Sequence, residues 1–227
     1  MAKLNRLQMA WRAAQDLQEG MVVNLGLGMP VACSDYVPAG REIIFQSENG
    51  VISAGPLAAP GAADPDLVDA GSRQITIAVG GSVIDSTASF AMIRGGHIDV
   101  TLLGAFEVAA NGDLANWDSR IPDKGPLVGG AMDLAASAKA VWVIMEHTTR
   151  KGAPRLLDRC TLPLTAPACV KRIYTDLAVL SVTPEGFVVH EIVPGVSQAE
   201  LQAATGAKLH FAPDCGVLLS PDIADAG

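Results

Sequence analysis

Short apolar segments alternate along this chain with segments that carry helical signals, and this alternation constrains the fold more than any other feature. Strand-like apolar runs occupy residues 21–25, 42–46, 75–79, 98–103 and 141–145. Helices are predicted over residues 5–19, 85–94, 131–138 and 197–205, with a further helical turn from Pro30. Because strands that alternate with helices build parallel sheets, the sequence predicts an α/β fold with an open, largely parallel sheet flanked by helices.

Two hairpins are expected as additions to this sheet. Asn111-Gly112 is a strong hairpin-turn dipeptide, so residues 105–117 are predicted to fold back on themselves. Residues 177–193 are typical of two strands around a turn at 184–186, whereas the Pro-, Gly- and Ala-rich segment 55–65 is predicted to be loop. No repeat or linker divides the chain. We therefore expect one domain over residues 1–211, followed by a C-terminal tail over residues 212–227.

Charge and hydrophobicity argue against several classes of protein. The 227 residues carry a formal net charge of −8 without a stripe of Lys or Arg, so no nucleic-acid partner is expected. No apolar run approaches the roughly 20 residues needed to cross a bilayer. The N-terminal segment lacks the apolar core of a signal peptide, and the four cysteines form no CxxC pair. We therefore expect a cytoplasmic protein with reduced thiols and no membrane association.

Three polar or glycine-rich segments directly follow predicted strands, the place where ligands bind in open α/β sheets. They are residues 24–30, 47–50 and 80–81. In the first, Gly26 and Gly28 fit the start of a dinucleotide-binding fingerprint, but Val31 stands at the third glycine position, so GxGxxG is not completed. The segment is either a tight strand-to-helix turn or a turn that also presents the Asn24 amide and backbone N–H groups to an acyl oxygen.

Glu48 is the candidate catalytic residue. It follows the apolar strand at residues 42–46 and precedes Asn49-Gly50, so its side chain is expected to project above the carboxyl edge of the sheet. A carboxylate that is desolvated there and poised by neighbouring amides is a useful nucleophile. A glutamate at a strand end is more often simply solvated, so position alone does not assign it a catalytic role.

Other chemical motifs are weak or absent. The four histidines show no HxxxH or HxH spacing and no clustered carboxylates, so no metal site is predicted. Glu146-His147 at a strand end could serve acid–base chemistry, although a surface or hydrogen-bonded core histidine is the commoner outcome. The chain contains neither GxSxG nor GxxxxGK(S/T), which argues against a serine hydrolase and a P-loop enzyme.

An ordered series of blocks carries a resemblance to a known family. The blocks lie at residues 24–30, 47–50, 94–99, 103–106, 112–117, 129–134 and 169–170 together with 175–176. From about Met9 to Phe211 the chain resembles the B subunit of class I (3-oxoacid) CoA-transferases. Segments 128–134 and 177–186 are most similar to those of 3-oxoadipate CoA-transferases, while residues 212–227 match no block of the family.

The resemblance implies a role for each matching residue. Glu48 corresponds to the nucleophile of the family, and Asn24 corresponds to an asparagine that lies against the reacting acyl group. The block that begins at Gly129 lines the CoA side, with Val128 in place of the usual preceding methionine. The residues expected to bind substrate or CoA are Asn24, Gly26, Gly28, Asn49, Gly50, Gly129, Gly130 and Ala131.

The chemistry implied by the resemblance is transfer of CoA from an acyl-CoA, such as succinyl-CoA, to a 3-oxoacid through a glutamyl-CoA thioester. The favoured acceptor is 3-oxoadipate, with acetoacetate as the alternative. Beyond the CoA thioester itself, no cofactor is expected. Because the chain matches only the B half of the family pattern, it is expected to need an A subunit, in an A2B2 heterotetramer.

Three alternative functions stay open at this stage. An acyl-CoA hydrolase of the same fold would differ only in letting water reach the glutamyl thioester. A non-catalytic α/β ligand-sensing module would tolerate any residue at position 48. A sugar-phosphate isomerase would need basic residues around a phosphate, and none cluster at these strand ends.

Overall fold

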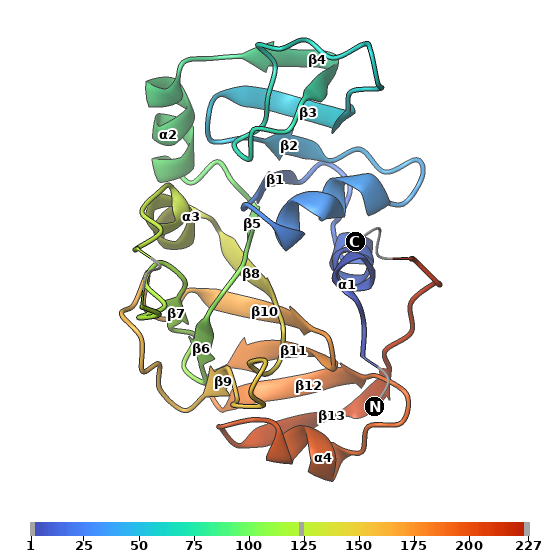
Figure 1. Cartoon of the computed structure of the whole chain (residues 1–227), viewed down its shortest axis with the longest axis vertical. Coiled ribbons are helices and arrows are strands. Elements are labelled where there is room, and N and C mark those ends of the chain that lie inside the picture. The colour runs from blue at the N-terminus through green and yellow to red at the C-terminus, as the bar shows by residue number, and fades with distance from the viewer. Residues whose placement is uncertain (1–2, 123–124, 225–227) are drawn as a thin grey trace.

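A ten-stranded open sheet dominates the computed structural model, which describes residues 3–122 and 125–224 (Figure 1). The strand order is β13-β12-β11-β10-β8-β5-β1-β2-β3-β4. The five central strands are mutually parallel: β10 (Val170–Thr175), β8 (Ala140–Met145), β5 (Val100–Leu103), β1 (Val22–Leu25) and β2 (Ile44–Gln46). The predicted fold class, an open and largely parallel sheet with flanking helices, is confirmed.

Mostly antiparallel pairs extend the sheet at both edges, the exception being the parallel pair of the two outermost strands beyond β10. Beyond β2 lie β3 (Val51–Leu57) and β4 (Ile75–Val83). Beyond β10 lie β11 (Ala178–Thr183), β12 (Gly186–Ile192) and β13 (Leu209–Val217). The antiparallel pair β11–β12 is the hairpin predicted over residues 177–193, so that prediction is confirmed.

A second, three-stranded sheet contains the other predicted hairpin. It consists of β7 (Leu114–Ala115), β6 (Glu107–Ala109) and β9 (Leu156–Leu157). β6 and β7 are antiparallel, and Gly112 in the turn between them has φ +88°, a backbone conformation that glycine adopts without steric cost. The sequence therefore identified this turn correctly.

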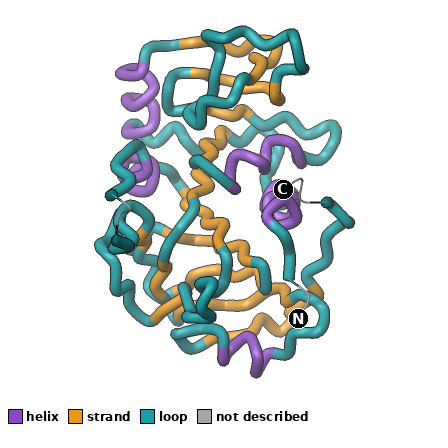
Figure 2. Tube along the Cα trace, in the orientation of Figure 1, coloured by secondary structure: helices purple, strands orange, loops and turns teal. Residues whose placement is uncertain are grey.

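Helices cover both faces of the large sheet (Figure 2). Figure 1 shows α1 (Arg6–Gln15) and the 3-10 helix η1 (Met29–Tyr36) on one side and α2 (Ser86–Arg94) and α3 (Ala131–Ser137) on the other. The short α4 (Gln198–Ala203) opens with the predicted capping box, in which Ser197 and Glu200 exchange hydrogen bonds. On α1, the side chains of Ala10, Ala13 and Ala14 are fully buried, which lets this helix lie close to the strands.

Several predicted boundaries are wrong, and glycine explains two of them. Segment 55–65 was expected to be loop, yet β3 continues to Leu57. A Cβ at Gly55 would collide with Thr76 of β4, so this glycine marks a close approach of two strands rather than a chain break. Gly80-Gly81 was expected at a strand end but lies inside β4, where a Cβ at Gly81 would meet Ile77.

Three further elements differ from expectation. The first helix ends at Gln15 rather than at residue 19, and the turn that starts near Pro30 is a 3-10 helix. The central parallel strand β10 was not predicted from the sequence, because the charged Lys171 and Arg172 interrupt its apolar residues. Long-range pairing with β8 holds β10 in the sheet.

The C-terminal segment is integrated into the fold as far as the structure describes it. β13 runs across residue 211, where the domain was expected to end, and pairs with β12 through Val217. Leu218 is buried, and the carbonyls of Pro221 and Ile223 accept hydrogen bonds from side chains at the start of α1. Residues 1–2 of the expected domain and 225–227 of the expected tail lie outside the described residues.

Candidate active site

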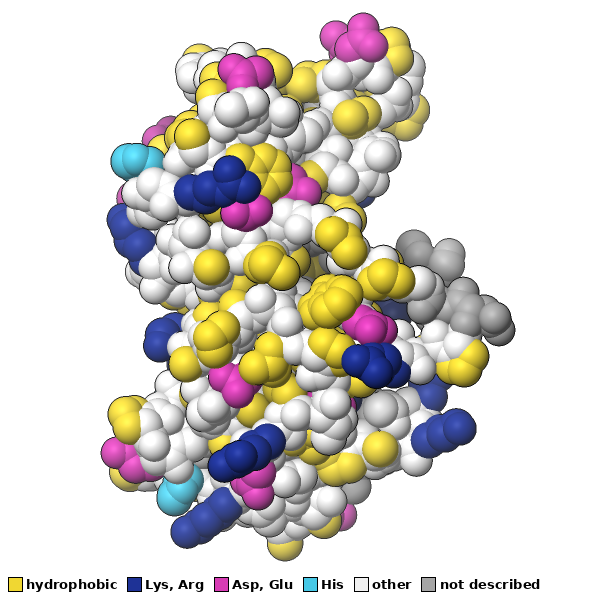
Figure 3. Space-filling view, turned by 90° about the vertical axis from the view of Figure 1, so that its left-hand side faces the viewer, with side chains coloured by type: hydrophobic (Ala, Val, Ile, Leu, Met, Phe, Trp, Pro, Cys, Tyr) yellow, Lys and Arg dark blue, Asp and Glu magenta, His cyan; other side chains and the backbone are white. Residues whose placement is uncertain are grey.

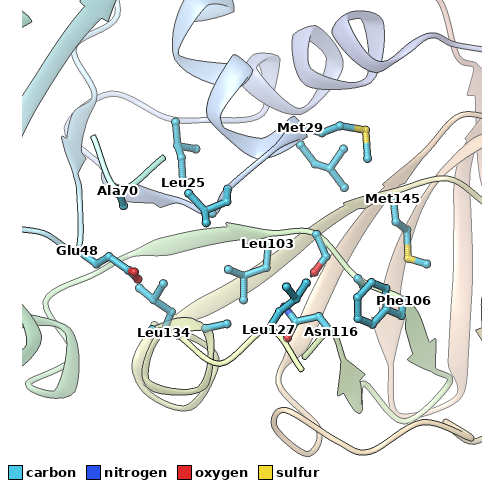
Figure 4. A pocket seen from close by; sticks show the side chains of 18 of the residues that line it. Leu25, Met29, Glu48, Ala70, Leu103, Phe106, Asn116, Leu127, Leu134 and Met145 are labelled. Atoms are coloured by element: carbon cyan, nitrogen blue, oxygen red, sulfur yellow. The ribbon is translucent and has the colours of Figure 1, made fainter. Parts of the chain in front are cut away.

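A cavity of about 470 Å³ opens at the carboxyl ends of the central parallel strands. Its walls come from the segments that follow β1, β2, β5 and β8 and from the start of α3 (Figure 4). The side chains that line it are mostly apolar, and among the described residues they include Leu25, Met29, Leu103, Phe106, Leu127, Leu134 and Met145, together with the polar Glu48, Asn116 and Arg155.

The sheet topology explains why the cavity lies there. β1 is flanked by β2 on one side and β5 on the other, so the chain leaves β1 in one direction and returns later on the opposite side. The crossovers that follow neighbouring strands then diverge above the carboxyl edge and leave a crevice between them. The sequence predicted a site at this edge, and two of its three candidate segments, residues 24–30 and 47–50, meet there. The third, Gly80-Gly81, does not.

Glu48 lies in the turn between β2 and β3 and points into the cavity. Figure 4 shows its carboxylate entering from the side opposite Phe106 and Met145. Burial, and secondarily the negative charge of Asp133, raise the pKa of this carboxyl group above its ordinary value. No hydrogen bond from the described part of the chain contributes to that pKa. Glu48 is therefore a partly desolvated acidic side chain that faces the cavity.

Gly130 lies directly against this carboxylate. A Cβ at position 130 would collide with Glu48 Oε2 and approach Glu48 Cδ to 2.8 Å, and Phe90 Cζ would lie at 3.1 Å. Glycine at this position therefore lets the Glu48 side chain occupy its observed place. Gly129 and Ala131 line the same wall of the cavity, so the structure brings all three residues of this predicted group together with Glu48.

Asn24 lies beside the cavity rather than in its lining. It is 2% exposed, and its Nδ2 donates hydrogen bonds to the backbone oxygen of Gln46 at 3.0 Å and to Gln46 Oε1 at 2.6 Å. The direct contact of Asn24 with an acyl group thus stays a prediction. In this structure its amide donor is bonded to the neighbouring strand.

The other residues predicted to bind substrate shape the backbone. Gly26 lines the cavity and donates its backbone N–H to the oxygen of Leu102, and a Cβ there would approach that oxygen to 2.9 Å. Gly28 has φ +87° immediately before η1. Asn49 donates its side-chain amide to the oxygen of Val68, and Gly50 has φ +116° in the turn that carries Glu48. Asn49, Gly50 and Gly28 are not among the lining residues.

Glu146-His147, the weaker candidate pair, is outside this cavity. His147 is fully buried, and its ring nitrogens lie 3.0 Å from Thr175 Oγ1 and 2.8 Å from Thr205 Oγ1. Burial lowers its pKa to about 4. It is therefore a neutral, hydrogen-bonded core histidine.

Several residues of the site were not predicted from the sequence. Phe106, Asn116 and Arg155 line the cavity from the small sheet and the segments beside it, which no local pattern connects to Glu48. The buried Gln46 could have been noticed, because it is a polar residue that closes an otherwise apolar strand. Within residues 3–122 and 125–224, no group of three His, Cys, Asp or Glu side chains is placed to hold a metal ion.

Apolar side chains gather at the mouth of the cavity. Figure 3 shows them across the middle of the face that carries α2 and α3. Leu127, Val128 and Met132 lie on the segment around the start of α3 and are 65%, 83% and 58% exposed. Patches of this kind are typical of surfaces that another protein covers. No helix in the described ranges has both the length and the apolar character that crossing a membrane would require.

Comparison with protein families identifies the class of protein that this fold and site define. The Coenzyme A transferase model matches residues 6–204. The chain therefore belongs to the coenzyme A transferase family, and several of its relatives are named as B subunits. It is 51% identical to the B subunit of 3-oxoadipate CoA-transferase from Acinetobacter baylyi, over 91% of this chain and 95% of that protein. It is 46% identical to the B subunit of succinyl-CoA:3-ketoacid coenzyme A transferase from Helicobacter pylori, over 87% of this chain and 94% of that protein.

Solved structures share the fold at lower sequence identity. An acyl-CoA transferase from Escherichia coli O157:H7 superposes with a TM-score of 0.73 at 20% identity, covering 94% of this chain. This chain spans only 43% of that longer one. Glutaconate coenzyme A-transferase from Acidaminococcus fermentans gives a TM-score of 0.68 at 17% identity, covering 97% of this chain and 91% of that chain. At these identities the likeness is one of fold.

Proposed function

We propose that this chain is the part of a 3-oxoacid CoA-transferase that carries the covalent intermediate, with Glu48 as the nucleophile. The observation that carries the proposal is the partly buried Glu48 carboxylate, which points into a largely apolar cavity against the backbone of Gly130. A carboxylate in such surroundings is a stronger nucleophile than one in water, because it has lost solvation that would otherwise stabilise its charge.

The reaction proceeds by exchange between carboxylates and conserves the thioester. A Glu48 oxygen attacks the carbonyl carbon of the donor acyl-CoA, the C–S bond breaks, and CoA leaves as a thiolate. The thiolate then attacks the Glu48 carbonyl of the resulting mixed anhydride, which releases the donor acid and forms the glutamyl-CoA thioester. The acceptor carboxylate repeats these steps in reverse. No oxidant, reductant or metal takes part.

The apolar walls favour transfer over hydrolysis. Both the anhydride and the thioester react with water, so the site has to exclude it. Leucine, methionine and phenylalanine side chains line the cavity that the carboxylate enters, and the mouth of the cavity carries exposed apolar side chains that a partner could cover. This observation favours a transferase over the acyl-CoA hydrolase alternative. The oxyanions that form along the path need N–H donors, each worth a few kcal/mol of transition-state stabilisation.

The substrate pair and the partner follow from the relatives. We assign succinyl-CoA as the donor and 3-oxoadipate as the preferred acceptor, with acetoacetate as the weaker one, because the relatives include a 3-oxoadipate enzyme at 51% identity. Because these relatives are named as B subunits, we infer that the partner is an A subunit, in an A2B2 assembly. The exposed apolar patch of Leu127, Val128 and Met132 is the surface on which we place this partner. A cytoplasmic location fits these substrates.

The test is chemical capture of the intermediate. With succinyl-CoA and no acceptor, the assembled enzyme should accumulate CoA on Glu48, and borohydride, which reduces thioesters but not carboxylates, should inactivate it only after the donor is added. Peptide mapping should place the modification within residues 47–50, and Glu48→Ala should abolish both adduct and turnover. The proposal is overturned if the adduct lies elsewhere or if Glu48→Ala turns over. Higher kcat/KM with acetoacetate than with 3-oxoadipate would refute only the substrate assignment.

A further inference from the structure

A chain of buried polar side chains lies beneath the turn that carries Glu48. Asn24 on β1 and Gln46 on β2 are register partners in a parallel pair, so their side chains leave the sheet on the same face. Each is 2% exposed. The two hydrogen bonds from Asn24 Nδ2 fix both the backbone oxygen and the side-chain oxygen of Gln46.

Gln46 extends this chain to the peptide unit that precedes Glu48. Its Nε2 donates to the backbone oxygen of Ser47 at 3.1 Å and to Ser89 Oγ at 2.7 Å. The Ser47 carbonyl belongs to the peptide bond that joins Ser47 to Glu48. This contact therefore fixes the plane of the peptide group that carries the Glu48 Cα. Ser89 belongs to α2 and is completely buried, so the helix anchors the glutamine from the other side.

The opposite side of the same turn is held by hydrogen bonds to the backbone of two other segments. The N–H of Ala70 donates to Ser47 Oγ at 2.9 Å, and the Asn49 side chain donates to Val68 O at 2.8 Å. The N–H of Ile84 donates to Gly50 O at 2.9 Å. Every residue that flanks Glu48 in this turn is therefore tied to another segment, while the Glu48 carboxylate points into the cavity.

We propose that Gln46 and Ser89 are positioning residues that hold Glu48 in its attacking geometry, with Asn24 as the outer member of the chain. The proposal rests on Glu48 being the nucleophile and adds the device that aims it. Burying three polar side chains is less favourable than burying apolar ones of the same size, unless they are mutually satisfied. A satisfied network fixes one arrangement, and a nucleophile displaced by about 1 Å loses roughly a hundredfold in rate.

The experiment compares Gln46→Met and Ser89→Ala in the enzyme assembled with its A subunit. Met keeps the length of glutamine but makes none of its three side-chain hydrogen bonds, so kcat should fall roughly a hundredfold with KM within about twofold. Ser89→Ala should lower kcat roughly tenfold. The rate of donor-dependent inactivation by borohydride should fall in parallel. Because Ser89 acts mainly through Gln46, its own contact with the Ser47 oxygen being longer at 3.5 Å, the double variant should be little slower than Gln46→Met alone.

The matched control is Ser181→Ala. The Ser181 hydroxyl forms a hydrogen bond of 2.7 Å with His190 Nε2, and it lies on β11, away from the cavity. It should lower the melting temperature about as much as Ser89→Ala while kcat stays unchanged. If the network merely supports the fold, Ser89→Ala will also lower the melting temperature and leave kcat unchanged. That result overturns the proposal, as does a change in KM alone.

Failure of this inference is distinct from failure of the proposed function. If Glu48→Ala is inactive and both network variants keep wild-type kcat, Glu48 is the nucleophile but needs no such support. If Glu48→Ala keeps its turnover, the proposed function itself is wrong. Should Gln46→Met not assemble with the A partner, Ser89→Ala decides the matter, since it removes a single hydroxyl.

Discussion

At the scale of single residues, the site depends on the electrostatic surroundings of one carboxyl group. Burial raises the Glu48 pKa most, and Asp133 adds to that effect because a second negative charge disfavours ionisation of the first. Asp133 lies in the first turn of α3 and is itself paired with Arg94 at 2.7 Å. In the proposed mechanism the attacking form of Glu48 is the ionised one, so its protonation should control activity at low pH.

We predict that kcat/KM falls on the acidic side at a higher pH than an ordinary glutamate would give. Activity is lost as pH falls through the raised pKa, because the protonated carboxyl group does not attack. Asp133→Asn should shift this limb to lower pH and raise kcat/KM at the wild-type midpoint by up to about twofold. A pH–rate profile checks this. The control is Asp99→Asn. It removes a carboxylate that is likewise paired, with Lys139 at 2.7 Å, but that lies before the first residue of β5, and it should leave the acidic limb of the profile unchanged.

A second residue-scale prediction concerns Gly130. Gly130→Ala should lower kcat by at least roughly a hundredfold, because the new methyl group occupies the position of Glu48 Oε2 and displaces the carboxylate. The backbone of Gly130 has φ −69°, which alanine adopts freely, so the fold should persist. Gly125→Ala is the control, since no atom lies within 4 Å of a Cβ there. Normal turnover by Gly130→Ala would mean that Glu48 reacts from a different position.

At the scale of elements, hydrogen bonds at the start of α1 hold this helix and the C-terminal segment together. The α1 helix begins with a capping box, in which the Asn5 side chain accepts from Gln8 N at 2.8 Å and Gln8 Oε1 accepts from Asn5 N at 2.9 Å. Asn5 Nδ2 also donates to Ile223 O, which joins the C-terminal segment to this helix. One residue therefore serves both the helix and the chain end.

Replacing this cap should destabilise the protein without affecting the chemistry. Asn5→Ala should lower the free energy of unfolding by about 1 kcal/mol, since it removes the N-cap hydrogen bond. Chemical denaturation measures this, and kcat of the assembled enzyme should stay unchanged. Gln18→Ala, at an exposed position past the end of α1, should change stability by less than about 0.5 kcal/mol. Equal losses in the two variants would show that the cap contributes nothing.

At the scale of the whole molecule, His147 joins segments from three parts of the chain. It follows β8 and lies between Thr175 at the end of β10 and Thr205 after α4, and its backbone N–H donates to Asp176. Burial lowers its pKa from 6.5 to about 4, Asp176 opposes that shift, and Lys3 adds to it. The folded protein therefore binds fewer protons at this site than the unfolded chain.

Stability should consequently decrease in acid. The loss begins as pH falls below 6.5, where the unfolded histidine takes up its proton, and is complete below about 4, where the folded one does so as well. A difference of this size corresponds to about 3 kcal/mol. Denaturation at a series of pH values checks this, and His147→Gln, which cannot be protonated, should flatten the profile between those limits. A variant profile as steep as the wild type would assign the acid sensitivity to other groups.

The sequence by itself determined the central strands β1, β2, β5 and β8, the helices α2, α3 and α4, and both hairpins. Apolar runs, capping residues and turn glycines act on neighbours along the chain, so their effect can be recognised locally. The same logic placed Glu48 at a strand end. The family resemblance then gave it an expected role, and the comparisons confirmed the family.

Only the tertiary structure decided which groups face one another at the site. Gly130 lies against Glu48, and Asn24 bonds to Gln46, because parallel pairing and the crossover into α3 bring distant segments together. Gly80-Gly81 resembled a strand end but lies in a register shift within β4, because the residues on both sides of it pair with β3. Such partners depend on strand register and on packing between elements. Both are set by the whole burial pattern of the chain, which no local stretch of sequence contains.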